Sequence, residues 1–241
     1  MEHKKPSRAL AISPRTNQIY DLAVLRNIFP DLSSGRHAIA QINLNDVIYA
    51  AALEQKLDCW DKPAVTQRLI DEYTARHNLL YTYGGWMECR DFLWQNTYMR
   101  AENKFIHLGV DINVPAGIAI SSPLFGRVIH TDYDGGSDVD WGTSLAIEGG
   151  KYVYIFAHLA KELSVKEGDI VHPTKILGTV GTWPDNGNVF NHLHIQAIPT
   201  HVYKKHKLAN FVNLDGYGRM GDERRLSYAF PNPLLLLAQR N

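Results

Sequence analysis

The first part of the chain repeats its apolar residues with the period of a helix. Ile19, Leu22, Ala23 and Phe29 recur at helical spacing, and Pro30 ends the pattern. Spacings of three and four residues bring side chains to one side of an α-helix, and the residue before a proline rarely continues one. This segment is therefore predicted to be helical as far as Pro30.

Two further helices are predicted from the same periodicity. They cover residues 43–57 and residues 61–77. Asp61 is expected to cap the second of them, and Pro63 suits its first turn because the N–H that proline lacks would be unpaired there in any case. The apolar stripe expected on the helix at 43–57 consists of Val47, Ala51 and Leu57.

From about Phe105 the apolar residues recur with a period of two. Short apolar runs are separated by clusters of glycine, proline and aspartate, which is typical of antiparallel strands joined by turns. The pattern predicts an α+β chain. We expect a helical N-terminal region at residues 1–80 and a β-rich domain at residues 81–241, whose core spans residues 105–198.

The run 106–112 places two potential metal ligands on one face of a predicted strand. Alternation would turn Ile106, Leu108, Val110 and Ile112 into the core, which leaves His107, Gly109 and Asp111 on the opposite face. An imidazole and a carboxylate can bind one ion together, and a glycine between them would leave room for it. Taken alone, a His–Asp pair at this spacing occurs often by chance, and a surface ion pair is its more common explanation.

Two more runs could bring histidines to the same face. In 191–197 the core positions are Leu193, Ile195 and Ala197, whereas His192, His194 and Gln196 share the other side. The strand predicted at 152–159 ends with His158 on the face of its aromatic residues. Neutral imidazole is the commonest protein metal ligand, but two exposed strand histidines and one hydrogen-bonded structural histidine remain the alternatives.

Composition narrows the classes of function. Apolar residues make up 45% of the chain and charged residues 21%, which is typical of a globular protein with a sizeable core. The 25 Lys and Arg residues balance the 25 Asp and Glu residues, so no overall charge favours nucleic acid or an anionic membrane. Cys59 and Cys89 are too few for a disulfide framework or a cysteine zinc cluster, and we expect two buried free thiols.

The N-terminal sequence shows no signal peptide, because its apolar stretch at 9–12 is short and is followed by Pro14 and Arg15. No stretch approaches the roughly 18 apolar residues that a transmembrane helix needs. The sequence therefore predicts a cytoplasmic protein, with export by a route that reads no usual signal as the alternative.

Taken together and in order, the motifs resemble those of the lysostaphin-type zinc metallopeptidases, the LytM-domain family. The family pattern is H-x-x-x-D, then A-H-L, then H-x-H, and this chain has HLGVD, AHL and HLH. The likeness extends to HLGVDINVPAGIAISSPLFGRVI, YIFAHL, KEGDIV and ILGTVG, and covers about residues 105–197. It implies a mainly antiparallel β domain of the duplicated hybrid motif type.

The resemblance also implies roles for individual residues. His107, Asp111 and His194 would coordinate Zn2+, and His158 and His192 would act as catalytic residues beside it. The implied activity is an endopeptidase that uses zinc-activated water to cleave amide bonds in short or glycine-rich peptides, above all peptidoglycan-type cross-links. The expected partner is such a substrate, without nucleic acid or membrane insertion. The alternatives are a non-hydrolytic binding or scaffold module and a zinc hydrolase of another cytosolic peptide or small amide.

Several features lie outside the motif pattern. The loop 182–191 is longer than the usual link into H-x-H, and together with His172 and Pro173 it predicts a reshaped substrate groove. Glu88 and Arg90 precede the motifs and form either an ion pair or part of a substrate site. An aromatic groove wall, or else a satellite hydrophobic cluster, is expected from Tyr81, Tyr83, Trp86 and Trp94.

Overall fold

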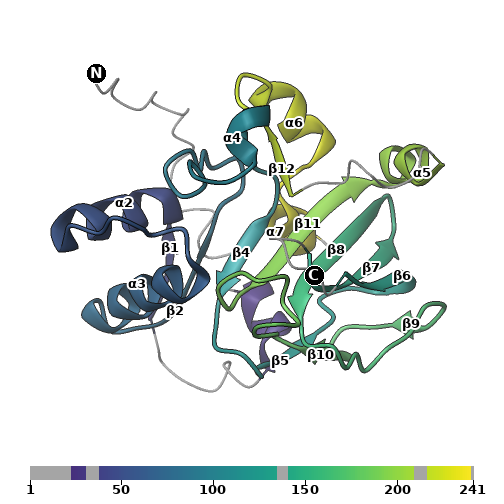
Figure 1. The fold of residues 1–241 in the computed structure, drawn as a ribbon. Coiled ribbons are helices and arrows are strands. Elements are labelled where there is room, and N and C mark those ends of the chain that lie inside the picture. Colours follow the sequence, from purple (N-terminus) through teal and green to yellow (C-terminus); the bar gives the residue numbers. More distant parts are fainter. Residues whose placement is uncertain (1–22, 31–37, 135–140, 209–215, 240–241) are drawn as a thin grey trace.

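An eight-stranded sheet forms the centre of the protein, as the computed structural model shows for residues 23–30, 38–134, 141–208 and 216–239. The strand order is β1-β2-β4-β11-β8-β7-β6-β9 (Figure 1). Strands β1 and β2 are parallel, and the other neighbours in the sheet are antiparallel. The predicted α+β class with a mainly antiparallel sheet is confirmed.

The strands of this sheet come from both the first and the later part of the chain. They are β1 (Ala38–Ile42), β2 (Leu79–Gly84), β4 (Val110–Asn113), β6 (Gly126–Tyr133), β7 (Thr143–Gly149), β8 (Tyr152–Leu159), β9 (Ile170–Val171) and β11 (Leu193–Pro199). Two small antiparallel sheets accompany it. They pair β5 (Ala119–Ser121) with β10 (Ile176–Thr179), and β3 (Lys104–His107) with β12 (Tyr217–Arg219).

The helices lie around the sheet and include the predicted ones. They are α2 (Leu44–Gln55), α3 (Pro63–Arg76), α4 (Met99–Glu102), α5 (Thr200–Leu208), α6 (Glu223–Ala229) and α7 (Pro233–Ala238). Residues 23–28 are also helical, as predicted, while the beginning of that pattern, Ile19 and Leu22, lies outside the described residues. No helix within the described ranges combines the length and the apolar character needed to cross a bilayer.

One detail predicted for the helices is wrong, and another is correct only in part. Lys62, not Asp61, is the N-cap of α3, and it makes no side-chain capping bond. The buried stripe of α2 consists of Leu44, Ile48 and Ala52. The predicted Ala51 and Leu57 are half-buried and pack against the same cluster, which is described next, whereas the predicted Val47 is half-exposed and does not belong to it.

Hydrophobic side chains fill both faces of the sheet. The largest cluster combines apolar residues of β4, β8 and β11 with the helical segment 23–28 and with α7, so segments from opposite ends of the chain pack on one face. A second cluster joins α2 and α3 to residues 93–105 and to Phe190. Strand β1 lies within the predicted region 1–80, yet it pairs with β2 in the same sheet as the later strands. The boundary at residue 80 stays a prediction.

The packing of α2 can be tested with two substitutions on one helix. Ile48 is 0% exposed and Leu53 is 60% exposed. Ile48→Ala should lower the free energy of unfolding by roughly 2–5 kcal/mol, because it removes buried methyl groups and leaves a cavity. Leu53→Ala should change it by less than about 0.5 kcal/mol. Urea denaturation of both variants measures the difference, and equal losses would contradict the observed orientation of the helix.

Candidate metal centre

His107 and Asp111 come from two different strands, and the single strand predicted over 106–112 is wrong. Strand β3 ends at His107 and pairs with β12, whereas β4 begins at Val110 and joins the large sheet between β2 and β11. Leu108 and Gly109 connect them. All four predicted core residues are buried, but they belong to two hydrophobic clusters. Ile106 and Leu108 lie in one, and Val110 and Ile112 lie in the other. Both polar side chains nevertheless face the same site.

Gly109 makes room for a histidine ring rather than for an ion. A Cβ at this position would lie 2.5 Å from Nε2 of His194 and 2.6 Å from the carbonyl oxygen of Ile195. Real Cβ atoms do not approach other atoms so closely, and here one of the obstacles is backbone. The glycine therefore lets β11 bring His194 up to the turn between β3 and β4.

Strand β11 supplies the third group of the site. Leu193, Ile195 and Ala197 lie in the main core, as predicted, and His194 lies on the opposite face. His194 is directly opposite Asp111 in the antiparallel pair formed with β4. Directly opposite residues in such a pair project to the same side of a sheet, so the register itself brings these two side chains together.

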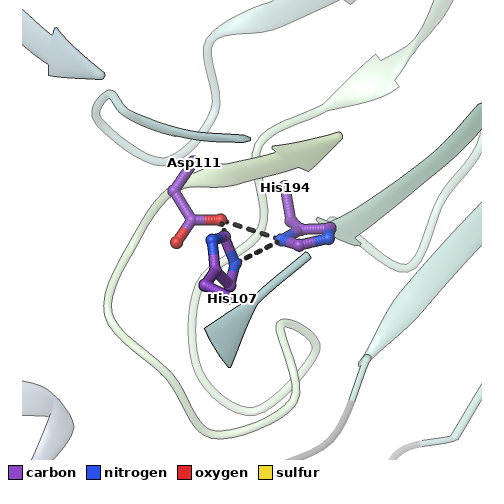
Figure 2. A group of neighbouring side chains, drawn as sticks. All are labelled: His107, Asp111 and His194. Atoms are coloured by element: carbon purple, nitrogen blue, oxygen red, sulfur yellow. Dashed lines mark hydrogen bonds and ion pairs between the residues drawn. The ribbon is translucent and has the colours of Figure 1, made fainter. Parts of the chain in front are cut away.

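The side chains of His107, Asp111 and His194 converge on one point (Figure 2). Nδ1 of His194 lies 2.9 Å from Oδ1 of Asp111 and 3.1 Å from Nε2 of His107, and the third edge, from Nε2 of His107 to Oδ1 of Asp111, is 3.4 Å. All three residues are at most 2% exposed. Two imidazoles and one carboxylate thus form a small buried triangle of ligand atoms.

This triangle fits a tetrahedral metal ion. Zinc bonds to nitrogen and oxygen are about 2.0–2.1 Å long, so two ligand atoms of a tetrahedral site lie roughly 3.3–3.4 Å apart. The observed edges of 2.9–3.4 Å lie at or a little below this separation. A small adjustment would therefore accommodate an ion held by three protein ligands, with a fourth position left for water or substrate.

The second ring nitrogen of each histidine in the triangle is also bound. Nδ1 of His107 lies 3.0 Å from the carbonyl oxygen of Gly85, and Nε2 of His194 lies 3.4 Å from Oε1 of Gln196. A carbonyl oxygen only accepts, so Nδ1 of His107 carries the proton and donates it. Nε2 of His107 is then left with its lone pair toward the triangle, which is the usual arrangement of a metal-binding histidine.

A buried ion-pair network contacts Asp111. From the sequence, its members Glu88 and Arg90 could form either an ion pair or part of a substrate site. Arg90 donates to Oδ2 of Asp111 at 2.6 Å and to Oε1 of Glu88 at 3.2 Å. Burial alone would raise the pKa of Asp111, but His107 and the Arg90 guanidinium hold it well below its usual range. Glu88 and Arg90 therefore do form an ion pair, and it directly contacts the triangle.

His158 reaches the site through an irregularity in β8. Ala157 is opposite His194, so regular alternation would turn His158 to the other face, with Phe156. The predicted assignment of faces in this strand is therefore wrong. The register against β7 shifts between Thr143 and Leu145, and His158 has a φ of 63°. This β-bulge returns the His158 ring to the site side.

His158 and His192 lie side by side, with ring centroids 4.3 Å apart. Nδ1 of His158 donates to the carbonyl oxygen of Asn186 at 3.0 Å, and Nδ1 of His192 donates to that of Phe190 at 2.8 Å. Nε2 of His192 lies 3.5 Å from Oδ1 of Asp111. Both carbonyls belong to the loop 182–191, so this loop sets the orientation of both rings.

Burial keeps these histidines neutral. It lowers the pKa of His107 to about 3 and that of His192 to about 4, with the Arg90 guanidinium contributing to both. Burial and the neighbouring histidines lower the pKa of His158 well below its usual range. Near pH 7 each imidazole therefore has a lone pair with which to bind a metal ion or a proton.

Aromatic side chains line the cavity beside the triangle. Of the four aromatic residues predicted to do so, only Trp94 is among them. Tyr81 and Tyr83 belong to the main core, and Trp86 donates to the carbonyl oxygen of Phe230. The residues that line the cavity beside the histidines include Trp94, Tyr98, Met99, Trp141, Phe190 and Tyr217. Tyr98, Trp141 and Tyr217 are far apart in the sequence and belong to no motif, so periodicity and motif spacing carried no signal for them.

Known proteins resemble only part of this chain. No curated protein sequence matches it. A solved structure of LytU shares 28% identity over 39% of this chain and 62% of its own chain, with a TM-score of 0.34. A zinc-containing peptidase from Vibrio cholerae shares 26% identity over 39% of this chain and 27% of its own, also with a TM-score of 0.34. The matched segment thus spans less than two thirds of either chain.

The catalytic domain of lysostaphin from Staphylococcus simulans is 23% identical over 39% of this chain and 68% of its own, with a TM-score of 0.35. The family model of peptidase family M23 matches residues 105–207. That segment contains His107, Asp111, His158, His192 and His194. Residues 105–207 therefore match peptidase family M23, and this match confirms the resemblance to the lysostaphin-type peptidases.

Proposed function

We propose that this protein is a zinc-dependent endopeptidase that cleaves amide bonds in short or glycine-rich peptides, most notably peptidoglycan-type cross-links. The observation that carries the proposal is the triangle of His107, Asp111 and His194, whose ligand atoms lie within 4.8 Å of one another inside a peptidase-family segment. These three residues would hold the ion. Zinc supplies Lewis-acid chemistry that polarises a carbonyl and makes water a nucleophile near neutral pH.

His158 and His192 would act as the catalytic residues that handle protons. Their Nδ1 atoms donate to backbone carbonyls, so each Nε2 has a lone pair directed away from the loop 182–191. One Nε2 would take the proton that water loses as it adds to the peptide carbonyl. The same N–H can then donate to the oxyanion and finally pass its proton to the leaving amine, which completes hydrolysis to an acid and an amine.

The walls of the cavity favour an uncharged peptide segment. The cavity encloses about 520 Å³, part of it open to solvent, and aromatic and apolar residues form its sides. Among the described residues that line it, Arg90 is the one cationic side chain, and it is already paired with Glu88 and Asp111. A flat, neutral backbone such as that of oligoglycine could lie between aromatic rings without leaving a charge unpaired.

The proposed ligands can be tested by metal analysis of the purified full-length chain. Wild type should contain about one zinc per chain, since the triangle offers three ligand atoms for a single ion. His194→Ala should lose it, because two ligands hold zinc poorly. His201→Ala, which removes an exposed histidine on α5, is the matched control and should keep it. Wild type that stays metal-free after zinc is supplied would contradict the proposal.

The proposed catalytic residues can be tested by turnover of pentaglycine and of muropeptides. His192→Ala should bind zinc as wild type does but should lower kcat about 10²–10⁴-fold, the usual effect of losing a general acid–base group. His201→Ala should have the activity of wild type. Zinc-loaded wild type that binds these peptides without cleaving them would favour the binding module, and turnover confined to other small amides would favour the cytosolic hydrolase.

The neutral histidines also make the metal-free protein sensitive to acid. His107 and His192 have pKa values of about 3 and 4 in the fold, against 6.5 in an unfolded chain. Between pH 6.5 and the folded pKa values, the unfolded state binds more protons than the folded state. The stabilisation that comes from keeping these rings neutral is therefore complete above pH 6.5 and is lost as the pH falls through this range. For each of these histidines the free energy of unfolding should fall by about 1.4 kcal/mol per pH unit in this window.

Urea unfolding of chelator-treated protein at pH 7.5 and at pH 5.5 measures this effect. His192→Gln should reduce the difference between the two pH values, because glutamine keeps polar contacts and does not titrate. A stability that does not change between these pH values would show that the rings are protonated or accessible to solvent in the metal-free fold.

A further inference from the structure

Arg90 is placed to control the carboxylate of the triangle, although it lies before the segment that matches the peptidase family. Its side chain is 2% exposed. The 2.6 Å bond from Arg90 occupies Oδ2 of Asp111. Oδ1 is the oxygen that faces His107, His192 and His194, at 3.4, 3.5 and 2.9 Å. The two oxygens of this carboxylate therefore have separate partners.

The guanidinium is itself held on several sides. Its Nε donates to Oε1 of Glu88 at 3.2 Å, and the nitrogen that bonds Asp111 also donates to the hydroxyl of Tyr217 at 3.0 Å. Nε1 of Trp94 donates to the same hydroxyl at 2.7 Å. A planar guanidinium with partners in different directions has little freedom to turn, so it can fix the carboxylate that it bonds.

This arrangement is anchored to the beginning of α2. Oε1 of Glu88 accepts from the backbone N–H of Asn45 at 2.9 Å, in the first turn of the helix. N–H groups there have no partner within a helix, and a negative charge is favoured beside them. The side chain of Asn45 in turn accepts from the backbone N–H groups of Phe92 and Leu93 at 3.1 and 3.0 Å. The segment that carries Arg90 is thus tied to α2 at both ends.

We infer that Arg90, fixed by Glu88 at the start of α2, is a positioning residue that restricts Asp111 to a single metal-binding oxygen. The inference rests on the proposed metal-dependent function. With Oδ2 engaged by Arg90, Asp111 offers Oδ1 alone, and the ion keeps an open position for water or substrate. The helical region before the peptidase segment thereby completes the metal centre.

A different role for Arg90 would be direct binding of a substrate carboxylate, since Arg90 lines the cavity. Its bonds to Glu88, Asp111 and Tyr217 argue against this role, because a substrate would have to displace buried partners. The two roles differ in measurable ways. A positioning residue affects the environment of the metal in the absence of substrate, whereas a substrate-binding residue affects KM.

Cobalt substitution separates these roles. Full-length wild type and Arg90→Met are loaded with Co2+, whose visible absorption is strong at four-coordinate sites and weaker at higher coordination numbers. Arg90→Met should still bind one ion, because its ligands remain, but its absorption should weaken as Oδ2 becomes free to join the metal. With Zn2+, kcat should fall about 10–100-fold, the usual effect of losing a partner of a ligand, and KM should change little.

Three further variants make the test specific. Arg90→Lys keeps the charge but not the planar fork, so it should restore the Co2+ spectrum in part. Glu88→Gln should change the spectrum in the same direction but less, because it loosens Arg90 without removing it. Arg68→Met, which removes an arginine paired with Glu72 on the surface of α3, should leave spectrum and activity unchanged. If circular dichroism shows that Arg90→Met is unfolded, Arg90→Lys and Glu88→Gln provide the test.

Two results would overturn the inference while leaving the metal site intact. One is a folded Arg90→Met with the Co2+ spectrum of wild type, and the other is a raised KM with unchanged kcat and spectrum. A wild type that binds neither Co2+ nor Zn2+ would instead refute the proposed function, and the inference with it.

Discussion

The register between β4 and β11 is the constraint on which the site depends. It places Asp111 directly opposite His194, and one position further along it places Ile112 opposite Leu193 in the main core. Side chains alternate along a strand, so a slip of β11 by one residue would turn His194 into the core and Leu193 out of it. The hydrophobic core and the proposed metal centre therefore enforce the same pairing.

The remaining groups reach this strand pair through irregular backbone. His107 arrives at the end of β3 through a turn that requires Gly109, and His158 arrives through a bulge in β8. The loop 182–191 orients His158 and His192, and Gln67 of α3 accepts from the backbone N–H of Asn191 at 2.7 Å, where this loop meets β11. Regular strands thus supply the rigid part of the site, while a loop within the peptidase segment and a helix from outside it, α3, complete it.

Much of this could be predicted from the sequence, because alternation and motif spacing are local properties. The polar face of β11 and the helices α2 and α3 followed directly from periodicity. The end of β3 at His107 could not be predicted, because the apolar residues alternate without interruption from β3 to β4. Only the long-range strand pairing shows that these two strands belong to different sheets. The same holds for Arg90 and Tyr217, which are 127 residues apart and meet through tertiary packing.

The bulge at His158 has an energetic consequence. Its φ of 63° lies in the left-handed region, where a non-glycine residue is strained by roughly 1–2 kcal/mol. An asparagine or glycine would tolerate this backbone better, yet neither could replace an imidazole in proton transfer. The position is therefore one where stability and activity oppose each other. Selection for a more robust fold alone would tend to remove the histidine that the proposed chemistry needs.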